Sequence, residues 1–158
     1  AAHSEVADMS FDWSVTGLDF AKTLNPIAAK AAMKKGLSKG MKVVANQVKV
    51  ETPVDTGRLR ASVTDEVREM GSEIVGVVGS NVDYARYVEE GTAPHWPPVA
   101  ALEAWGNRHG IPAFLVARAI AKNGTKARRM FGKVLESPFI AGVVQRYVGE
   151  ELRKVIWG

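Results

Sequence analysis

The amino-acid sequence predicts an α+β fold, in which a small antiparallel sheet packs against a long amphipathic helix, a helical hairpin and a C-terminal helix. After Pro26, apolar residues recur at spacings of three and four, which is typical of an amphipathic helix. Two extended runs are separated only by Gly71 and Ser72, which indicates a β-hairpin. Because strands and helices are segregated and no strand–helix unit repeats, α+β is favoured over a doubly wound parallel fold.

The size and composition of the chain favour one globular domain over residues 1–158. The 158 residues suffice for a single hydrophobic core, and 46% hydrophobic with 24% charged residues is typical of a soluble protein. Cysteine is absent, which excludes disulfides, thiolate nucleophiles and cysteine-ligated metals. No apolar run approaches the roughly 20 residues of a membrane span, and residues 1–5 do not resemble a signal peptide. We therefore expect a protein that is assembled in a cytoplasm, without a membrane partner.

The first half of the chain contains the predicted strands and the longest helix. Residues 10–16 alternate aromatic or aliphatic residues with polar ones, which predicts a half-buried strand. The long helix should begin after Asn25 as N-cap, with Pro26 in its first turn, and end near residue 51 because of the following proline. Gly36 and Gly40 each weaken this helix by about 1 kcal/mol relative to alanine, or they mark close helix packing.

The β-hairpin is predicted over residues 62–70 and 73–80, after a polar turn at residues 53–57. The second run is apolar on both faces, so we expect it to be the more central strand. The first run has a polar face formed by Thr64, Glu66 and Arg68.

The second half of the chain is predicted to be mainly helical. Its proline and glycine residues mark the ends of the elements. In chain order we expect a short helix or turn over residues 84–90 and an irregular loop over residues 91–98. A helical hairpin should follow, with one helix from Pro97 or Pro98 to His109 and the other from Pro112 to Asn123. The last helix should have Ser137 as N-cap and Pro138 in its first turn.

No arrangement of residues indicates catalysis, a metal or a cofactor, so we expect a protein that is not an enzyme. The histidines His3, His95 and His109 lack the spacing of a zinc site. Glu89, Glu90 and His95 would form a hydrolytic or metal cluster if they converged, but a solvated acidic turn is the favoured interpretation. The nucleophile elbow, the Walker loop and the dinucleotide fingerprint are all missing.

Two basic regions are candidates for an interface in this chain of net charge +4. The lysines of the long helix would contact either a nucleic-acid backbone or an acidic neighbouring protein, or they are simply solvated. The second region precedes Met130 and Phe131 and is expected to be an exposed loop, although Lys122 alone fits a helix C-terminus equally well. The basic residues in the two regions are Lys30, Lys34, Lys35, Lys39, Lys42 and Lys49, and then Arg118, Lys122, Lys126, Arg128 and Arg129.

The proline loop also contains a candidate contact residue, Trp96. A rigid loop presents a large aromatic group at low entropic cost, so we expect Trp96 to contact a neighbouring molecule. The alternative is that Trp96 is buried within its own subunit.

Two segments together resemble a known family. TPVDTGRLRASV at residues 52–63 and VGSNVDYARYVEEGT at residues 78–92 resemble the hallmark segments of the tail-component family of long-tailed bacteriophages, also called minor tail or tail-completion proteins. The stretches PPVAALEAWGNRHGI and FLVARAIAKNGTKARRMF are similar to the version of the family with a helical insertion. The resemblance covers residues 17–135. It departs from the family in lacking a proline before Phe131 and in the length of the terminal helix.

The resemblance implies a structural α+β subunit that assembles as a ring of six copies and has no cofactor. Its expected place is the head–tail junction of the virion, as a tail-completion, tail-terminator or neck subunit. There it would join the tail tube to the head connector around the DNA channel after assembly in the host bacterium. The expected partners are other copies of itself, neighbouring connector and tail proteins, and DNA in the channel. The alternative is a small basic nucleic-acid-binding protein.

The family segments give scaffold or interface roles to particular residues. Gly57 and Gly91 permit unusual backbone angles, Asp55 is suited to an Asx turn, and the tyrosines offer contact area. The turn of the first segment would comprise Asp55, Thr56, Gly57 and Arg58, and the second segment Tyr84, Tyr87, Glu89, Gly91 and Thr92. The candidate interface residues are Lys30, Lys34, Lys42, Asp55, Arg58, Tyr84, Tyr87, Trp96, Arg118, Arg128 and Arg129.

Overall fold

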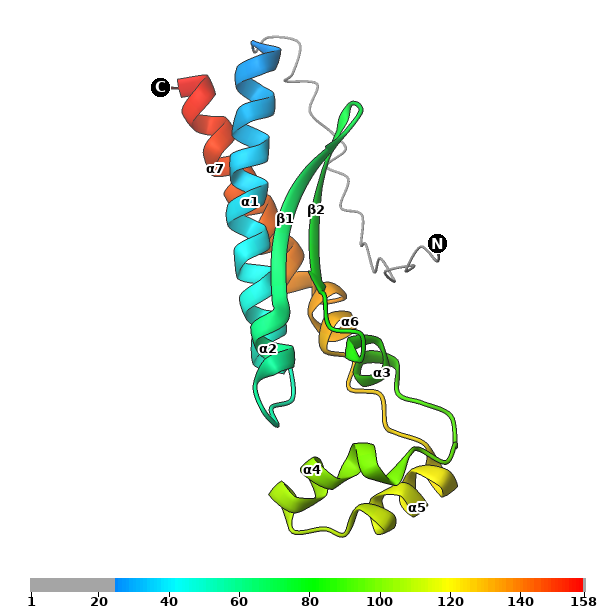
Figure 1. Ribbon diagram of the computed structural model, residues 1–158. Coiled ribbons are helices and arrows are strands. Elements are labelled where there is room, and N and C mark those ends of the chain that lie inside the picture. The colour runs from blue at the N-terminus through cyan, green and yellow to red at the C-terminus, as the bar shows by residue number, and fades with distance from the viewer. Residues whose placement is uncertain (1–24, 158) are drawn as a thin grey trace.

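The computed structural model describes residues 25–157, which form an elongated body and a separate helical arm (Figure 1). The body contains two long helices, a β-hairpin and three short helices, and the arm is a pair of helices at its lower end. In chain order the elements are α1 (Pro26–Glu51), α2 (Arg58–Ser62), β1 (Val63–Met70), β2 (Glu73–Ser80), α3 (Ala85–Glu90), α4 (Val99–His109), α5 (Ala113–Asn123), α6 (Met130–Leu135) and α7 (Pro138–Trp157).

The predicted α+β class and the limits of the longest helix are confirmed. The Asn25 side chain accepts a hydrogen bond of 3.0 Å from the amide of Ile27, and Pro26 occupies the first helical turn. At the other end Thr52 is extended because Pro53 follows it, and the Thr52 hydroxyl donates to the carbonyl of Val48 at 2.7 Å.

Helices α1 and α7 lie antiparallel and pack closely through two glycines of α1. A Cβ built on Gly36 would lie 2.5 Å from the Cα of Val148, and one on Gly40 would lie 3.1 Å from the Cα of Val144. The glycines therefore mark close helix packing, which was one of the two interpretations that the sequence allowed. The core around this contact includes Met41, Val44 and Val48, each at most 1% exposed, together with the buried face of α7.

The β-hairpin is confirmed, with the register running from Val63 opposite Ser80 to Met70 opposite Glu73. The two-residue turn uses Gly71 at a positive φ of 63°. The prediction of a central second strand is wrong for the described residues, because their sheet contains β1 and β2 alone. Strand β2 is nevertheless the more buried of the two, although both strands pack against α1. The predicted strand at residues 10–16 lies outside the described residues.

The helices of the second half are confirmed, but two short helices were not predicted. Helices α2 and α6 have five and six residues, too few for a periodic apolar pattern. Residues 91–98 are mainly irregular as expected, except that Thr92 forms a β-bridge with Thr125. Among the helices of residues 25–157, none is long and apolar enough to cross a membrane.

Candidate interface

The arm, residues 93–123, is joined to the body by a narrow neck where Thr92 pairs with Thr125 (Figure 1). The two residues exchange backbone hydrogen bonds of 3.1 Å, and their hydroxyls lie 3.0 Å apart. The preceding residues, Gly91 and Gly124, have φ of 74° and 68°. A Cβ on Gly91 would lie 2.4 Å from the carbonyl oxygen of Thr125, and one on Gly124 2.0 Å from that of Thr92. Only glycine fits at either position, which confirms the expectation for Gly91.

Glu89 fixes the body beneath the neck. Its two carboxylate oxygens accept hydrogen bonds of 2.9 Å from the amides of Phe131 and Gly132, so it caps the first turn of α6 from another segment. Glu89 is 8% exposed, which contradicts the predicted solvated acidic turn. Glu90 is exposed and pairs with Arg86, whereas exposed His95 lies 2.9 Å from the carbonyl oxygen of Ala93. These contacts give Glu89 a structural role, and Glu90 and His95 have separate partners.

The second basic region is an exposed set of cations beside the neck. Arg118, Lys122, Lys126 and Arg128 are exposed, and no carboxylate of the described chain pairs with them. Arg129 pairs with Glu136 at 2.5 Å. Met130 and Phe131 are 0% and 2% exposed, so the expected exposed loop is wrong for these two residues. They enter the core because Glu89 caps α6 and turns their side chains inward.

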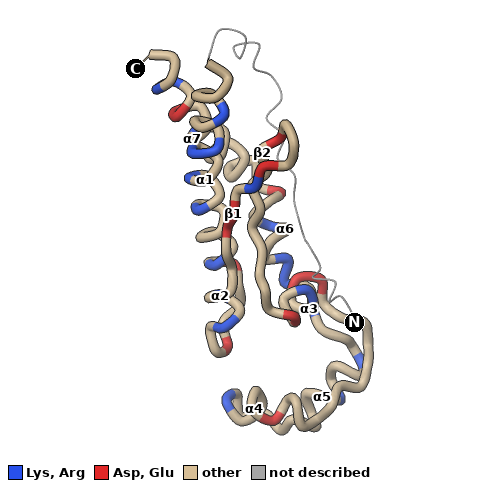
Figure 2. The backbone as a smooth tube through the Cα atoms, turned by 45° about the horizontal axis from the view of Figure 1, so that its top comes forward, with Lys and Arg blue, Asp and Glu red and all other residues tan. Residues whose placement is uncertain are grey.

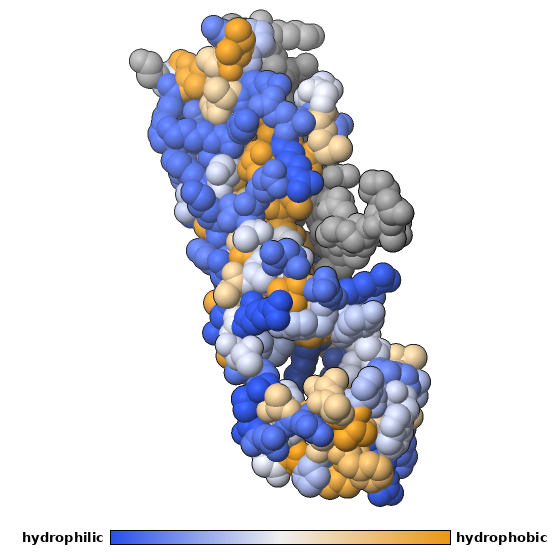
Figure 3. Space-filling model, viewed as in Figure 1, coloured by the Kyte–Doolittle hydropathy of each residue, from blue (hydrophilic) through white to orange (hydrophobic). Residues whose placement is uncertain are grey.

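The arm keeps much of its apolar surface uncovered. Trp96 is 56% exposed and Phe114 is 54% exposed, and their rings meet edge to face with centroids 5.8 Å apart. Ile111 and Leu115 are also exposed, at 42% and 49%. Figure 3 shows apolar side chains gathered on this lower part of the molecule. Trp96 is therefore not buried within its own subunit, and its contact with another molecule stays a prediction.

The tip of the arm contacts the body through Asp55. The Asp55 carboxylate accepts hydrogen bonds from the Arg108 guanidinium, one of them at 3.0 Å, and lies 3.2 Å from the Nε2 of His109. The hydrogen bonds from Arg108, followed by the weaker effect of His109, hold the pKa of Asp55 below its ordinary value. The predicted Asx turn is wrong, because the Asp55 carboxylate bonds α4 instead. The local contact is made by Thr56, whose hydroxyl accepts from the amide of exposed Arg58 at 3.5 Å.

Most lysines of α1 are held in ion pairs within the subunit, although Figure 2 shows them along much of the helix. Lys30 and Lys34 lie 2.8 and 2.9 Å from the carboxylate of Glu69 on β1. The hydrogen bonds from Lys30 and then Lys34 lower the pKa of Glu69 to about 2. These two lysines therefore join α1 to the β-hairpin.

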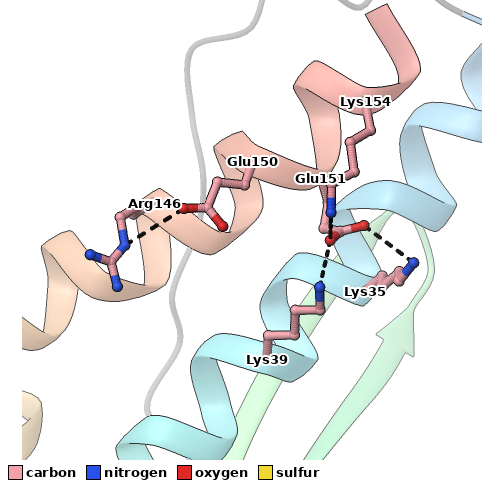
Figure 4. Close-up of polar contacts among 6 residues, drawn as sticks. All are labelled: Lys35, Lys39, Arg146, Glu150, Glu151 and Lys154. Atoms are coloured by element: carbon pink, nitrogen blue, oxygen red, sulfur yellow. Dashed lines mark hydrogen bonds and ion pairs between the residues drawn. The ribbon is translucent and has the colours of Figure 1, made fainter. Parts of the chain in front are cut away.

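A second cluster joins the other side of α1 to α7 (Figure 4). The Glu151 side chain is 5% exposed and lies 2.6 Å from Lys39, 2.7 Å from Lys154 and 3.4 Å from Lys35. The hydrogen bonds from Lys154 and then Lys39 lower the pKa of Glu151 to about 2, and Glu151 raises the pKa of Lys39. Exposed Lys42 has no ion pair with any residue that the structure describes. The predicted lysine face is thus not a continuous free surface.

The tyrosines of the second family segment lie exposed at α3, Tyr84 as its N-cap and Tyr87 within the helix. Tyr84 is 39% exposed and Tyr87 is 60% exposed, and Asp83 and Glu90 beside them are exposed as well. Tyr87 and Glu90 are three residues apart on α3 and so share one side of this helix, whereas Asp83 and Tyr84 lie in the turn that precedes it. We refer to Asp83, Tyr84, Tyr87 and Glu90 as the α3 patch.

Some residues of these surfaces were not singled out from the sequence. Phe114, Leu115 and Val116 are consecutive, and neighbours in a helix point about 100° apart, so one partner helix cannot cover all three. That apolar run was the available signal for an uncovered surface. Arg108 gave no local signal, because its partner Asp55 is distant in sequence.

The first part of the chain matches a family model described as "Bacteriophage HK97-gp10, putative tail-component" over residues 18–91. The match includes α1, α2, the β-hairpin and α3, and it ends at Gly91, the residue before the neck. It does not extend over the arm, although the resemblance was expected to reach residue 135. No curated protein and no solved structure gave a significant match. Residues 18–91, slightly less than half of the chain, are therefore similar to the HK97-gp10-like phage tail-component domain.

Proposed function

We propose that the chain is a structural subunit of the phage head–tail junction, which assembles as a ring of six copies and joins the tail tube to the head connector around the DNA channel. The match of residues 18–91 to a phage tail-component family is the observation that carries this proposal. A structural subunit acts through the surfaces that it offers, and a ring uses one surface toward each neighbour in the stack.

The charge of the chain is concentrated where such a surface would be. Residues 93–129 contain six lysines or arginines and one acidic residue, a net charge of +5. The whole chain carries +4, so everything outside this segment sums to −1. A surface with this charge attracts an acidic partner and sets the register of docking. Lys126 and Arg128, exposed cations beside the neck, are therefore the proposed contact with a neighbouring ring.

An infection experiment tests the proposed junction role. Phage lacking the gene should make filled heads and tail tubes that fail to join, and a plasmid copy of the gene should restore joined particles under the electron microscope. Normal infectious particles from the deleted phage would refute the proposal.

Charge reversal tests the proposed contact surface. A plasmid copy with Lys126→Glu and Arg128→Glu should fold normally, because exposed substitutions usually change stability by about 0.5 kcal/mol or less. It should nevertheless fail to restore joining. The lysines of α1 are the second candidate contact surface, and Lys42→Glu tests it. Lys30 and Lys34 are less suitable, because reversing their charge would also break their ion pairs with Glu69. If both surfaces are reversed and joining persists, the placement of the contact is wrong.

The second candidate function is binding of nucleic acid, favoured because Arg118 and Lys122, which have no ion pair with any described residue, lie on the same arm as Trp96 and Phe114. Aromatic rings and cations together are the means by which single strands are bound without sequence preference. Binding of DNA by the isolated protein should then weaken with salt, with a slope that reports the number of neutralised phosphates. Lys126→Glu should reduce that slope if the arm contacts DNA.

A further inference from the structure

We propose that the arm of one copy docks on the α3 patch of a second copy. The docking surface of the arm comprises Trp96, Phe114, Leu115, Arg118 and Lys122. This inference rests on the proposed ring and names a contact by which adjacent subunits would be connected.

The arm requires a cover that residues 25–157 of its own subunit do not supply. It has about thirty residues, fewer than the roughly 40 below which isolated units usually need a disulfide, a metal or a partner. Ala117 and Gly106 are the buried residues of its two helices, whereas Trp96 and Phe114 remain more than half exposed. An apolar surface this large in proportion to so small a unit is typical of an interaction site.

The arm and the α3 patch are complementary in charge and in side-chain type. Phe114, Arg118 and Lys122 are spaced by four residues, which places an aromatic ring and two cations along one side of α5. The α3 patch offers two tyrosines between Asp83 and Glu90. Asp83 has no ion pair with any described residue, just as Arg118 and Lys122 have none. Docking would pair these unmet charges and place cations near tyrosine rings.

The two surfaces belong to different copies because a single copy leaves both of them exposed. Trp96 and Tyr87 are 56% and 60% exposed in the same subunit, so its own α3 patch does not cover the arm. The tip of the arm is meanwhile held to the α2 side of the body by Asp55. Since the arm and the patch are different surfaces, each copy can engage two neighbours at once. Such a head-to-tail contact closes into a ring when the rotation between copies allows it.

A mixing experiment with two defective variants tests this contact. The arm variant carries Phe114→Ser and Arg118→Glu, and the patch variant carries Tyr87→Ser and Asp83→Lys. In sedimentation velocity the wild-type chain should form oligomers as its concentration rises, and each variant alone should remain a monomer. A one-to-one mixture should give a heterodimer, in which the intact arm of the patch variant docks on the intact α3 patch of the arm variant. Nothing larger should form, because the two remaining surfaces of that heterodimer are defective. Formation of the heterodimer also shows that both variants are folded.

Trp157→Ser is the matched control, since this tryptophan is 84% exposed and lies at the end of α7. It should assemble like the wild type. Oligomers of the patch variant would show an arm-to-arm contact, and oligomers of the arm variant would show that another surface joins the copies. Either result overturns the inference. A wild-type chain that stays monomeric and binds duplex DNA through its arm would overturn it as well. The infection experiment decides the proposed junction role separately, because it does not depend on assembly of the free protein.

Discussion

Substitution of Gly36 by alanine should destabilise the body, although alanine normally stabilises a helix. The added Cβ would lie 2.5 Å from the Cα of Val148 and 2.7 Å from the carbonyl oxygen of Tyr147. Ordinary contacts begin at 3.4 Å, so α1 and α7 would have to separate by about 0.9 Å. Both neighbours are backbone atoms, which cannot be relieved by rotation of a side chain.

The expected size follows from two opposing effects. Overpacking of this kind costs about 1–3 kcal/mol, and a clash between two helix backbones belongs at the upper end. The higher helix propensity of alanine returns about 1 kcal/mol. We therefore expect the free energy of unfolding to fall by about 2 kcal/mol. Gly149→Ala in α7 is the matched control, because nothing lies within 4 Å of its Cβ. It should raise the free energy by about 0.5–1 kcal/mol.

Urea unfolding followed by circular dichroism measures both variants at one subunit concentration. A loss of 2 kcal/mol lowers the urea midpoint by about 1 M when the slope is about 2 kcal/mol per M. Gly40→Ala should fall between the other two variants, since its Cβ would approach the Cα of Val144 only to 3.1 Å. If Gly36→Ala were as stable as Gly149→Ala, the close packing of α1 against α7 would be refuted.

Three further predictions concern the polar contacts. Glu89→Gln should lower the free energy of unfolding by about 1–3 kcal/mol, because an amide group offers only one acceptor to the two α6 amides. The control Glu90→Gln should change this free energy little. Equal effects of the two substitutions in urea unfolding would contradict the capping role of Glu89. The pKa of Glu151 is about 2 in the folded chain against an ordinary 4.5, so its contribution is complete above pH 4.5 and is lost as the pH falls toward 2. The melting temperature of the Glu151→Gln variant should therefore fall less steeply between pH 4.5 and pH 2 than that of the wild type. An equally steep fall would show that Glu151 is not the source of this pH dependence. Asp55→Asn should speed hydrogen exchange at the α4 end of the arm without shifting the urea midpoint of the body, and unchanged exchange there would show that the contact with Arg108 does not hold the arm.

Much of the fold was predictable from the sequence, because its main elements have strong local signals. Asn25 and Pro26 mark the start of α1, Gly71 marks the hairpin turn, and prolines and glycines mark the helices of the arm. The short helices α2 and α6 were missed because five and six residues are too few for a periodic apolar pattern. In α6 the decisive contact is the cap by Glu89, which is about forty positions earlier in the chain.

The interface was less predictable than the fold, since exposure depends on what tertiary contacts leave uncovered. The lysines of α1 looked like one basic face, but Glu69 and Glu151 come from opposite sides and engage four of them. Met130 and Phe131 looked exposed beside five cations and are instead core residues. Trp96 could be singled out because its surrounding prolines make a rigid loop. Whether Trp96 was covered could be decided only once the position of Phe114 was known.

The neck has a consequence for how the subunit can vary. Thr92 and Thr125 face each other across a bridge, so the chain leaves the body and re-enters it at nearly the same point. Everything between them is an insertion whose remaining described contact is the one of Arg108 and His109 with Asp55. Its length and sequence can therefore change if Gly91 and Gly124 remain and that polar contact is given up. The arm can accordingly be shortened, lengthened or exchanged for another hairpin as a cassette. The body would then serve as a common building block, and the cassette would set the reach and the choice of neighbour.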